Sequence, residues 1–303
     1  MSRIAAVVVT YNRCDLLEEC ISALLKSLVK VDVLVIDNAS TDRTFDVVQK
    51  FKDEKSIKYF NTGANLGGAG GFNYGIKKAY DLGYDYFWLM DDDVIVLENS
   101  LSELMDARKY IGEDFGFLSS LAVWTDGKSC KMNKHIVPDD QNQWNDDKIV
   151  CQQGIVRIGR ATFVSFLLKR EVVKDIGLPI KEYFIWGDDT EYSLRISSKY
   201  PCYYVSKSVV VHKMKANQSS SNFADMEDLE RIKRTTLSIR NDFCTYKRMG
   251  SRRLIKFHSY LARLFLGVLK SQSPYKFNKM ITIIAGWNKG LLFNPEIEYV
   301  DVE

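Results

Sequence analysis

The sequence predicts an α/β fold, a mostly parallel sheet with helices on both faces, followed by a helical C-terminal segment. Three observations support this expectation. In the first half, short β-rich runs alternate with segments of helical periodicity, which is typical of βα units. From about residue 225 onward the pattern is helical and basic. The 303 residues are 46% hydrophobic and 27% charged. That balance fits one globular domain with or without an appendage and excludes a disordered or fibrous chain.

Two βα units open the chain. The run IAAVVVTY at 4–11 is a buried strand, and apolar residues at three- and four-residue steps from Leu16 to Leu28 predict an amphipathic helix. VDVLVID at 31–37 is the second strand. The next helix opens at the capping-type residues 40–42 and runs through about Phe51.

The pattern continues and then changes. A third strand is expected at 56–63, a third helix at 71–83 and a fourth strand at 84–90, followed by a helix at about 100–110. Beyond it, longer strands are expected at 115–124, 155–170 and 202–214. We expect an α/β domain at 1–224, with halves at about 1–98 and about 99–224, and a basic helical segment at 225–303.

Bulk features restrict the setting. The apolar runs at 4–9, 264–269 and 280–287 are shorter than the roughly 20 residues that cross a bilayer. Six cysteines without a CxxC pair indicate neither a zinc site nor a disulfide framework, and favour reduced thiols in the cytoplasm.

Charge is unevenly divided along the chain. Residues 231–290 hold fourteen Lys and Arg and one acid, Asp242, giving +13; the remainder holds 28 basic and 38 acidic residues, giving −10. An amphipathic stripe between Arg252 and Lys270 is compatible with a helix packed on the catalytic domain or with an interfacial helix on anionic lipid. Nucleic acid is disfavoured, because no nucleic-acid motif accompanies the charge and the acidic body would repel a duplex.

Polar clusters follow four successive strands, where open α/β sheets bind ligands. They occupy residues 10–13, 37–40, 65–71 and 91–93. Each alone could be a helix cap or a turn. Because four occur in register, we expect a ligand site at this edge of the sheet.

The triplet Asp91-Asp92-Asp93 is the most informative cluster. Alternate residues of an extended chain point to one side, so Asp91 and Asp93 can hold one hard cation, Mg²⁺ or Mn²⁺. The alternative is a solvated acidic turn. His212, at the end of an apolar strand, is either structural or a third metal ligand.

A second acidic motif lies at 183–192, YFIWGDDTEY, just before a predicted helix. Its acids are either partners of the helix dipole or include a general base held at the helix start.

Six motifs occur in this order along the chain: VVVTYNR, IDNASTD, NLGGAGGF, MDDDV, WGDDTEY and VVVH. Together they resemble the motifs of family 2 glycosyltransferases with the GT-A fold, which are inverting enzymes using a nucleotide-diphosphate sugar. The resemblance covers about residues 4–215. It implies a catalytic domain at 1–224, with a nucleotide-binding half at about 1–98 and an acceptor-binding half at about 99–224. Together with Arg240-Asn241, the set resembles galactofuranosyltransferases and bacterial rhamnosyltransferases that build cell-surface polysaccharide.

The resemblance implies a role for each motif. Asp189 matches the catalytic base, with Asp188 and Glu191 beside it; Asp188 stands where many members carry Glu, which leaves open which acid of the pair is the base. Asp91, Asp93 and His212 would hold the metal. The nucleotide and donor sugar would contact Thr10, Tyr11, Arg13, Asp37, Asn38, Asn65, Gly67, Gly68, the backbone through Gly71, Asp91, Asp92 and Trp186. Asp37 would accept a hydrogen bond from the nucleotide base.

The expected reaction is a single displacement. Asp189 would deprotonate an acceptor hydroxyl while a Mn²⁺ or Mg²⁺ ion stabilises the leaving diphosphate. Water must be kept out, and segments 125–150 and 216–223 are candidate mobile loops.

The expected partners follow from the family. The donor is UDP-galactofuranose, with dTDP-rhamnose next, and the acceptor is a glycan, lipid-linked, of a surface polysaccharide such as O-antigen or capsule. The enzyme would be cytoplasmic and peripheral on the inner membrane, at its anionic cytoplasmic face. A homo-oligomer is compatible with the sequence. The alternatives are a sugar nucleotidyltransferase, which usually needs a glycine-rich loop where residues 10–20 have no glycine, and a non-catalytic sugar-nucleotide-binding protein, which would not keep the acids at 188–191.

Overall fold

The computed structural model describes residues 2–136, 152–217 and 223–300. Within these ranges the core is a nine-stranded sheet of order β3-β2-β1-β4-β8-β6-β9-β5, with β7 beside β9. The strands are β1 Ile4–Thr10, β2 Asp32–Asp37, β3 Ile57–Asn61, β4 Tyr86–Asp91, β5 Val94–Val96, β6 Phe117–Val123, β7 Ile155–Arg157, β8 Phe166–Lys169 and β9 Tyr203–His212. The helices are α1 Cys14–Leu24, α2 Thr44–Gln49, α3 Gly67–Asp81, α4 Ser100–Ile111, α6 Arg170–Ile176, α7 Asp188–Ser197, α8 Leu229–Arg248, α9 Ser251–Lys270 and α10 Lys276–Leu292, with short 3-10 turns η1 Lys181–Tyr183 and η2 Phe223–Asp225.

Most strands of the sheet run in one direction. β3, β2, β1 and β4 are joined by parallel pairings, and β6 is parallel to β9. β8 is antiparallel to both β4 and β6, while β5 and β7 are antiparallel to β9. Six of the nine strands therefore share one direction, which confirms the predicted α/β class.

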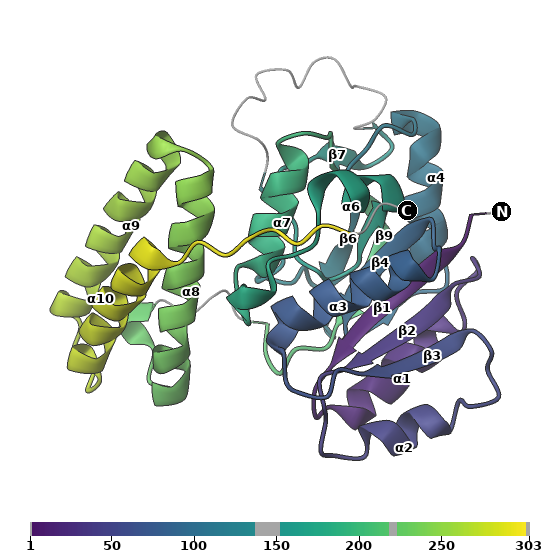
Figure 1. The fold of residues 1–303 in the computed structure, drawn as a ribbon, viewed down its shortest axis with the longest axis horizontal. Helices are drawn as coiled ribbons and strands as arrows, with labels where there is room; N and C mark the ends of the chain where they lie inside the picture. The colour runs from purple at the N-terminus through teal and green to yellow at the C-terminus, as the bar shows by residue number, and fades with distance from the viewer. Residues whose placement is uncertain (1, 137–151, 218–222, 301–303) are drawn as a thin grey trace.

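Helices cover both faces of the sheet (Figure 1). One apolar cluster joins the sheet to α1 and α4 through residues such as Leu17 and Leu104. The other joins it to α3, α6 and α7 through Ile76, Val173 and Tyr192. Burial of these stripes accounts for the helical periodicity that the sequence shows.

The expected strand at 155–170 is wrong. The chain forms two short strands there, β7 and β8, which pair in different parts of the sheet. The residues between them include Ile158, Phe163 and Val164, which are buried in the apolar clusters without joining the ladder. A continuous apolar run cannot distinguish a strand from an irregular segment that is buried equally well.

The helix expected at 71–83 begins earlier, at Gly67. Its glycines allow the helix backbone to lie close to the sheet: a Cβ on Gly71 would be 2.6 Å from Val9 Cγ1, and one on Gly75 would clash with Val7. The glycine-rich segment is therefore largely the first turns of α3 rather than a free loop.

The C-terminal segment is a helical unit, α8 to α10 with η2, which has its own apolar cluster. Phe257, Leu261 and Val268 of the predicted stripe are buried in it. None of the helices in the described part of the chain is long and apolar enough to span a membrane. In Figure 1 the unit stands beside the α/β body.

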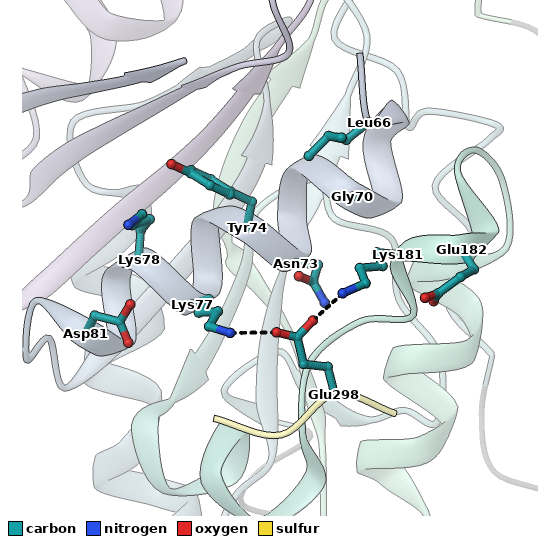
Figure 2. Close-up of a pocket in the computed structure, with 10 residues that line it drawn as sticks. All are labelled: Leu66, Gly70, Asn73, Tyr74, Lys77, Lys78, Asp81, Lys181, Glu182 and Glu298. Atoms are coloured by element: carbon teal, nitrogen blue, oxygen red, sulfur yellow. Dashed lines mark hydrogen bonds and ion pairs between the residues drawn. The ribbon is translucent and has the colours of Figure 1, made fainter. Parts of the chain in front are cut away.

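The end of the chain returns from α10 to the α/β body (Figure 1). Leu178 N donates to Glu298 O at 2.8 Å, and Val300 is buried in the sheet's apolar cluster. The Glu298 carboxylate binds Lys77 Nζ at 2.6 Å and Lys181 Nζ at 2.9 Å, beside a cavity of about 550 Å³ (Figure 2). Burial disfavours this charge, but the two lysines outweigh it and lower the pKa of Glu298 to about 2. The tail thus ties the helical unit to the body.

Candidate active site

Three of the predicted polar clusters end neighbouring strands at one edge of the sheet. Thr10 pairs with Asp37 across β1 and β2, and Val9 pairs with Asp91 across β1 and β4. Asn38 Nδ2 donates to Gly67 O at 3.0 Å, which brings in the fourth cluster. The parallel register therefore gathers the clusters, because carboxyl ends of parallel strands meet at one edge.

The acid triplet reaches His212 through the pairing of β5 with β9. Val94 lies opposite His212, and Lys213 N donates to Asp93 O at 2.8 Å. One ligand atom each of Asp91, Asp93 and His212 lies within 4.8 Å of the others. The structure thus brings together the three residues that the sequence suggested as metal ligands.

The chemistry of this cluster suits a divalent cation. His212 Nδ1 lies 2.9 Å from Asn133 Oδ1, and Asn133 orients its amide by donating from Nδ2 to Thr162 Oγ1 at 2.7 Å. Nδ1 therefore carries a proton, and Nε2 lies 3.2 Å from Asp93 Oδ1, which is buried. A deprotonated Nε2 and a carboxylate oxygen are both ligand atoms that a divalent cation takes in proteins.

Burial raises the pKa of Asp91 well above its usual range, and the neighbouring Asp93 raises it further. Bringing a cation to the cluster would reverse this effect, since the charged carboxylate would gain a partner.

Thr10 and Arg13 contact the middle acid of the triplet. Thr10 Oγ1 donates to Asp92 Oδ2 at 2.7 Å, and Arg13 Nη1 lies 3.2 Å from Asp92 Oδ1 and 3.0 Å from Asp93 Oδ2. Burial raises the pKa of Asp92 to about 6, against the opposing influence of Arg13 and Thr10. Both residues thus support the acid triplet, and their contact with a nucleotide stays a prediction.

The residues after β2 form a tightly bonded corner. Asp37 is 1% exposed, and its two carboxylate oxygens accept from Ser40 N at 2.8 Å and from Tyr59 OH at 2.6 Å. Asn38 Oδ1 is buried and lacks a hydrogen-bond partner among the described residues. Tyr11 leaves its ring 41% exposed at the same edge. The contact of these side chains with a nucleotide base stays a prediction. Tyr59 was not among the predicted site residues, although its aromatic side chain on the strand beside β2 was an available signal.

The start of α3 lies against the loop that precedes α7. Gly67 has φ +70°, and a Cβ there would clash with the Phe184 carbonyl, which accepts from Ala69 N at 3.2 Å. Asn65 Oδ1 accepts from Gly67 N at 2.9 Å. Gly68 faces open space, with no atom within 4 Å of its Cβ position. Of these glycines, Gly68 is thus the one placed to approach a ligand.

The loop before α7 has an unusual backbone. Phe184 and Trp186 have φ values of 63° and 65°, in the left-handed region that side chains other than glycine rarely adopt, and Gly187 follows with φ 88°. Asn241 of α8 holds this loop. Its Nδ2 donates to the carbonyl oxygens of Tyr183, Ile185 and Trp186 at 3.0, 3.2 and 2.7 Å.

Arg240 fixes the Asn241 amide by donating to its Oδ1 from Nε at 3.0 Å and from Nη2 at 2.8 Å. Its Nη2 also donates to Glu182 O at 2.8 Å. The resemblance marked Arg240-Asn241, but no periodicity or composition predicted this contact, because it joins segments more than 50 residues apart.

The three acids of α7 differ in their surroundings. Glu191 is bound at both oxygens by Arg195, at 2.8 and 2.9 Å, and Arg195 also donates to Ile176 O and Leu178 O. Glu191 therefore holds the helix to the chain after α6. Asp189, more exposed than Asp188, accepts from Thr190 N at 2.6 Å.

Both acids at the start of α7 have raised pKa values. Burial, then the neighbouring Asp189, raises the pKa of Asp188 to about 7. Burial also raises the pKa of Asp189, against hydrogen bonds from Thr190 and the charge of Arg160. A carboxylate with a raised pKa is a better proton acceptor, as a general base requires.

Parts of the candidate loops, residues 137–150 and 218–222, lie outside the described residues. The described part of the first, 125–136, brings Asn133 to His212.

Comparisons with known proteins agree with the geometry. Residues 5–177 match the sequence model of the family described as Glycosyl transferase family 2. The chain is 25% identical over 179 residues to the poly-β-1,6-N-acetyl-D-glucosamine synthase of Staphylococcus epidermidis, covering 57% of this chain and 41% of that protein. It is 37% identical over 91 residues to the galactofuranosyltransferase GlfT1 of Mycolicibacterium smegmatis, covering 30% of each. The matches thus span less than half the length of these relatives.

Solved structures share the fold. S. aureus TarS 1-349 aligns with a TM-score of 0.57 at 16% identity, covering 94% of this chain and 80% of TarS. The mannosyltransferase PcManGT from Pyrobaculum calidifontis, in complex with GDP-Man and Mn²⁺, aligns with a TM-score of 0.58 at 16% identity, covering 96% and 87%. At such identity the likeness establishes the fold.

Proposed function

We propose that this chain, which belongs to glycosyl transferase family 2 and has the GT-A fold, transfers a sugar from a nucleotide diphosphate to a glycan acceptor with inversion. One observation carries the proposal. The start of α3 links the strand ends that carry the acid cluster to the loop before the raised-pKa pair, because Asn38 Nδ2 donates to Gly67 O and Ala69 N donates to Phe184 O. A cation-binding group and a base are the two parts that this displacement needs.

The donor side of the reaction would use the strand ends. Asp91, Asp93 and His212 would hold a divalent cation, Mn²⁺ or Mg²⁺, which supplies charge neutralisation for a departing diphosphate. Tyr11 is exposed for stacking on a nucleotide base, and the unpartnered Asn38 Oδ1 is an available acceptor for a donor hydroxyl. The structure of PcManGT, which shares the fold, is described as a complex with Mn²⁺, and this supports a metal at the acid cluster.

The acceptor side would use α7. Asp189 takes the proton of the attacking hydroxyl as it adds to the anomeric carbon, while the bond from that carbon to the diphosphate oxygen breaks. Attack from the face opposite the leaving group inverts the anomeric configuration. Asp189 is favoured over Asp188 because it is the more exposed of the two.

The favoured donor is UDP-galactofuranose, with dTDP-rhamnose next. The 37% identity to a galactofuranosyltransferase over 91 residues supports it. The name of the S. epidermidis relative supports a polysaccharide product and makes UDP-N-acetylglucosamine a necessary comparison. We propose a lipid-linked glycan of a bacterial surface polysaccharide as the acceptor.

Incubation with these three donors and Mn²⁺ tests the proposal. Release of UDP or dTDP from one donor, increased by an added glycan acceptor, is the expected result. Release of pyrophosphate from a nucleoside triphosphate and a sugar phosphate would instead indicate a nucleotidyltransferase.

The helical unit carries the features of a membrane-docking surface. Its α9 and α10 border an apolar groove of about 500 Å³. Leu266 and Ile284 in this groove are about half exposed, and Phe277 near the start of α10 is 73% exposed. Exposed basic residues lie on the same helices: Lys256, Arg263, Lys270 and Lys289. Apolar side chains flanked by basic ones suit an anionic bilayer surface, where a lipid-linked acceptor is held.

A further inference from the structure

Asp242, the single acid of the basic stretch 231–290, lies beside the catalytic loop. Its Oδ1 is 3.7 Å from the position that a Cβ on Gly187 would occupy. Gly187 is the residue before Asp188, where α7 begins. The helical unit therefore brings a carboxylate to the start of the helix that carries the proposed base.

The Asp242 carboxylate makes no hydrogen bond or ion pair with any residue that the structure describes. Burial raises its pKa to about 7, and the nearby charge of Asp189 raises it further while that of Arg160 lowers it. The side chain is only partly buried, so the carboxylate oxygens are open to water or to a ligand that donates hydrogen bonds.

Arg160 supplies a second unpaired polar group in this region. Its Nε is buried and has no hydrogen-bond partner among the described residues, although Nη2 donates to Lys134 O at 3.4 Å. Its charge acts on both Asp189 and Asp242. Arg160 and Asp242 carry opposite charges, but in the described structure they form no ion pair within 4.0 Å. A donor and an acceptor thus stand unpaired near the base.

Two tyrosines lie within range of the Asp242 charge. Tyr246 is one helical turn beyond Asp242, and its ring stacks on Phe257, with centroids 5.4 Å apart. Tyr260 of α9 lies next to Phe257 and is 49% exposed. Burial and then the charge of Asp242 raise the pKa of both tyrosines. Aromatic surface with a few convergent polar groups is the usual composition of a small-molecule site.

We propose that Asp242 and Arg160 bind hydroxyl groups of the acceptor sugar beside Asp189, with Tyr246 and Tyr260 as the aromatic wall of this subsite. A sugar hydroxyl both donates and accepts, so one ring can satisfy the carboxylate and the guanidinium together. The inference rests on the proposed function. It gives the helical unit a direct part in substrate binding.

The test separates acceptor binding from donor chemistry. With the donor that the wild type uses, transfer is measured against octyl glycosides of galactofuranose, rhamnose and N-acetylglucosamine, and donor hydrolysis is measured without acceptor. Asp242→Asn is expected to raise the acceptor KM at least tenfold and to leave donor hydrolysis within twofold. Glu230→Gln, on the exposed side of the same helix, is expected to change neither.

Tyr260→Leu, at a half-exposed position, is the second variant and serves if Asp242→Asn does not fold. It is also expected to raise the acceptor KM. An unchanged acceptor KM in the variants, or a parallel loss of donor hydrolysis, would overturn the inference. If the wild type neither hydrolyses nor transfers any donor, the proposed function fails instead. Calorimetric binding of the octyl glycosides to wild type and Asp242→Asn then decides the inference: equal affinities contradict it.

Discussion

Asn241 Nδ2 donates to Trp186 O at 2.7 Å, and this contact joins the helical unit to the loop that leads into the proposed base. The same amide also binds the carbonyl oxygens of Tyr183 and Ile185, in a side chain that is fully buried. The loop has left-handed residues at Phe184 and Trp186. Such a backbone persists only where surrounding contacts over-determine it.

Replacing Asn241 is therefore expected to release the loop. Asn241→Ala removes the side-chain donor that three carbonyls share and is expected to cost about 2–4 kcal/mol of the free energy of unfolding. Donor turnover should fall as well, because Asp188 and Asp189 follow the loop directly. Denaturant unfolding and a turnover assay measure both effects. Asn288→Ala, exposed on α10, is the control, and equal stability of the two variants would contradict the clamp.

The tautomer of His212 is expected to control metal affinity. Asn133→Leu removes the acceptor that fixes the proton on Nδ1 and is expected to weaken Mn²⁺ binding roughly 10- to 100-fold. Calorimetric titration with Mn²⁺ measures the change. The matched variant Asn99→Leu, at an exposed position before α4, should bind as the wild type does. Unaltered affinity in Asn133→Leu would show that His212 is held by other contacts.

As the pH is lowered, activity should begin to fall at a higher pH than it would with a base of ordinary carboxylate pKa. A base acts only when unprotonated, and the pKa of Asp188 is raised to about 7 and that of Asp189 is also raised. As pH falls through this range the pair takes up a proton, so kcat/KM should fall about tenfold per pH unit below the break. The profile is measured at saturating Mn²⁺.

Asp188→Asn removes a negative neighbour of Asp189. The pKa of Asp189 should then be lower, and the acid limb of any remaining activity should move to lower pH. A wild-type profile that is flat down to pH 5 would be inconsistent with a base of raised pKa.

Membrane docking predicts salt-sensitive binding to anionic vesicles. The double variant of Leu266→Glu and Ile284→Glu places acids on the exposed apolar surface of α9 and α10 and should abolish cosedimentation with phosphatidylglycerol vesicles at low salt. Leu28→Glu, which alters an exposed leucine of the α/β body, should leave binding intact. Failure of the unmodified protein to sediment would remove the proposal.

Strand periodicity and motif order predicted much of the body and the grouping of Asp91, Asp93 and His212. The strands that end at Asp91 and at His212 are both strongly apolar, so their ends could be placed. The antiparallel pairing of β5 with β9 then brings His212 to the acid triplet. The expectation at 155–170 was wrong, because burial of Ile158 and Phe163 resembles that of a strand without its pairing.

The contacts of the helical unit could not be predicted from the sequence. Asn241 and Asp242 lie more than 50 residues from the loop they contact, and helical periodicity says nothing about which element a helix end meets. The basic stretch therefore also has a structural part, because Asn241 of α8 holds the loop before α7. The ion pair of Glu191 with Arg195 is different, because its i,i+4 spacing on a predicted helix could be read from the sequence.

The central claim, that Asp189 is the base of a direct displacement, is tested by the turnover of Asp189→Asn. The account predicts a loss of kcat of about 10²–10⁴-fold, with Mn²⁺ and UDP binding unchanged, while Asp175→Asn, a surface acid paired with Lys199, keeps normal turnover. Asp189→Asn turnover within twofold of the wild type would contradict the account.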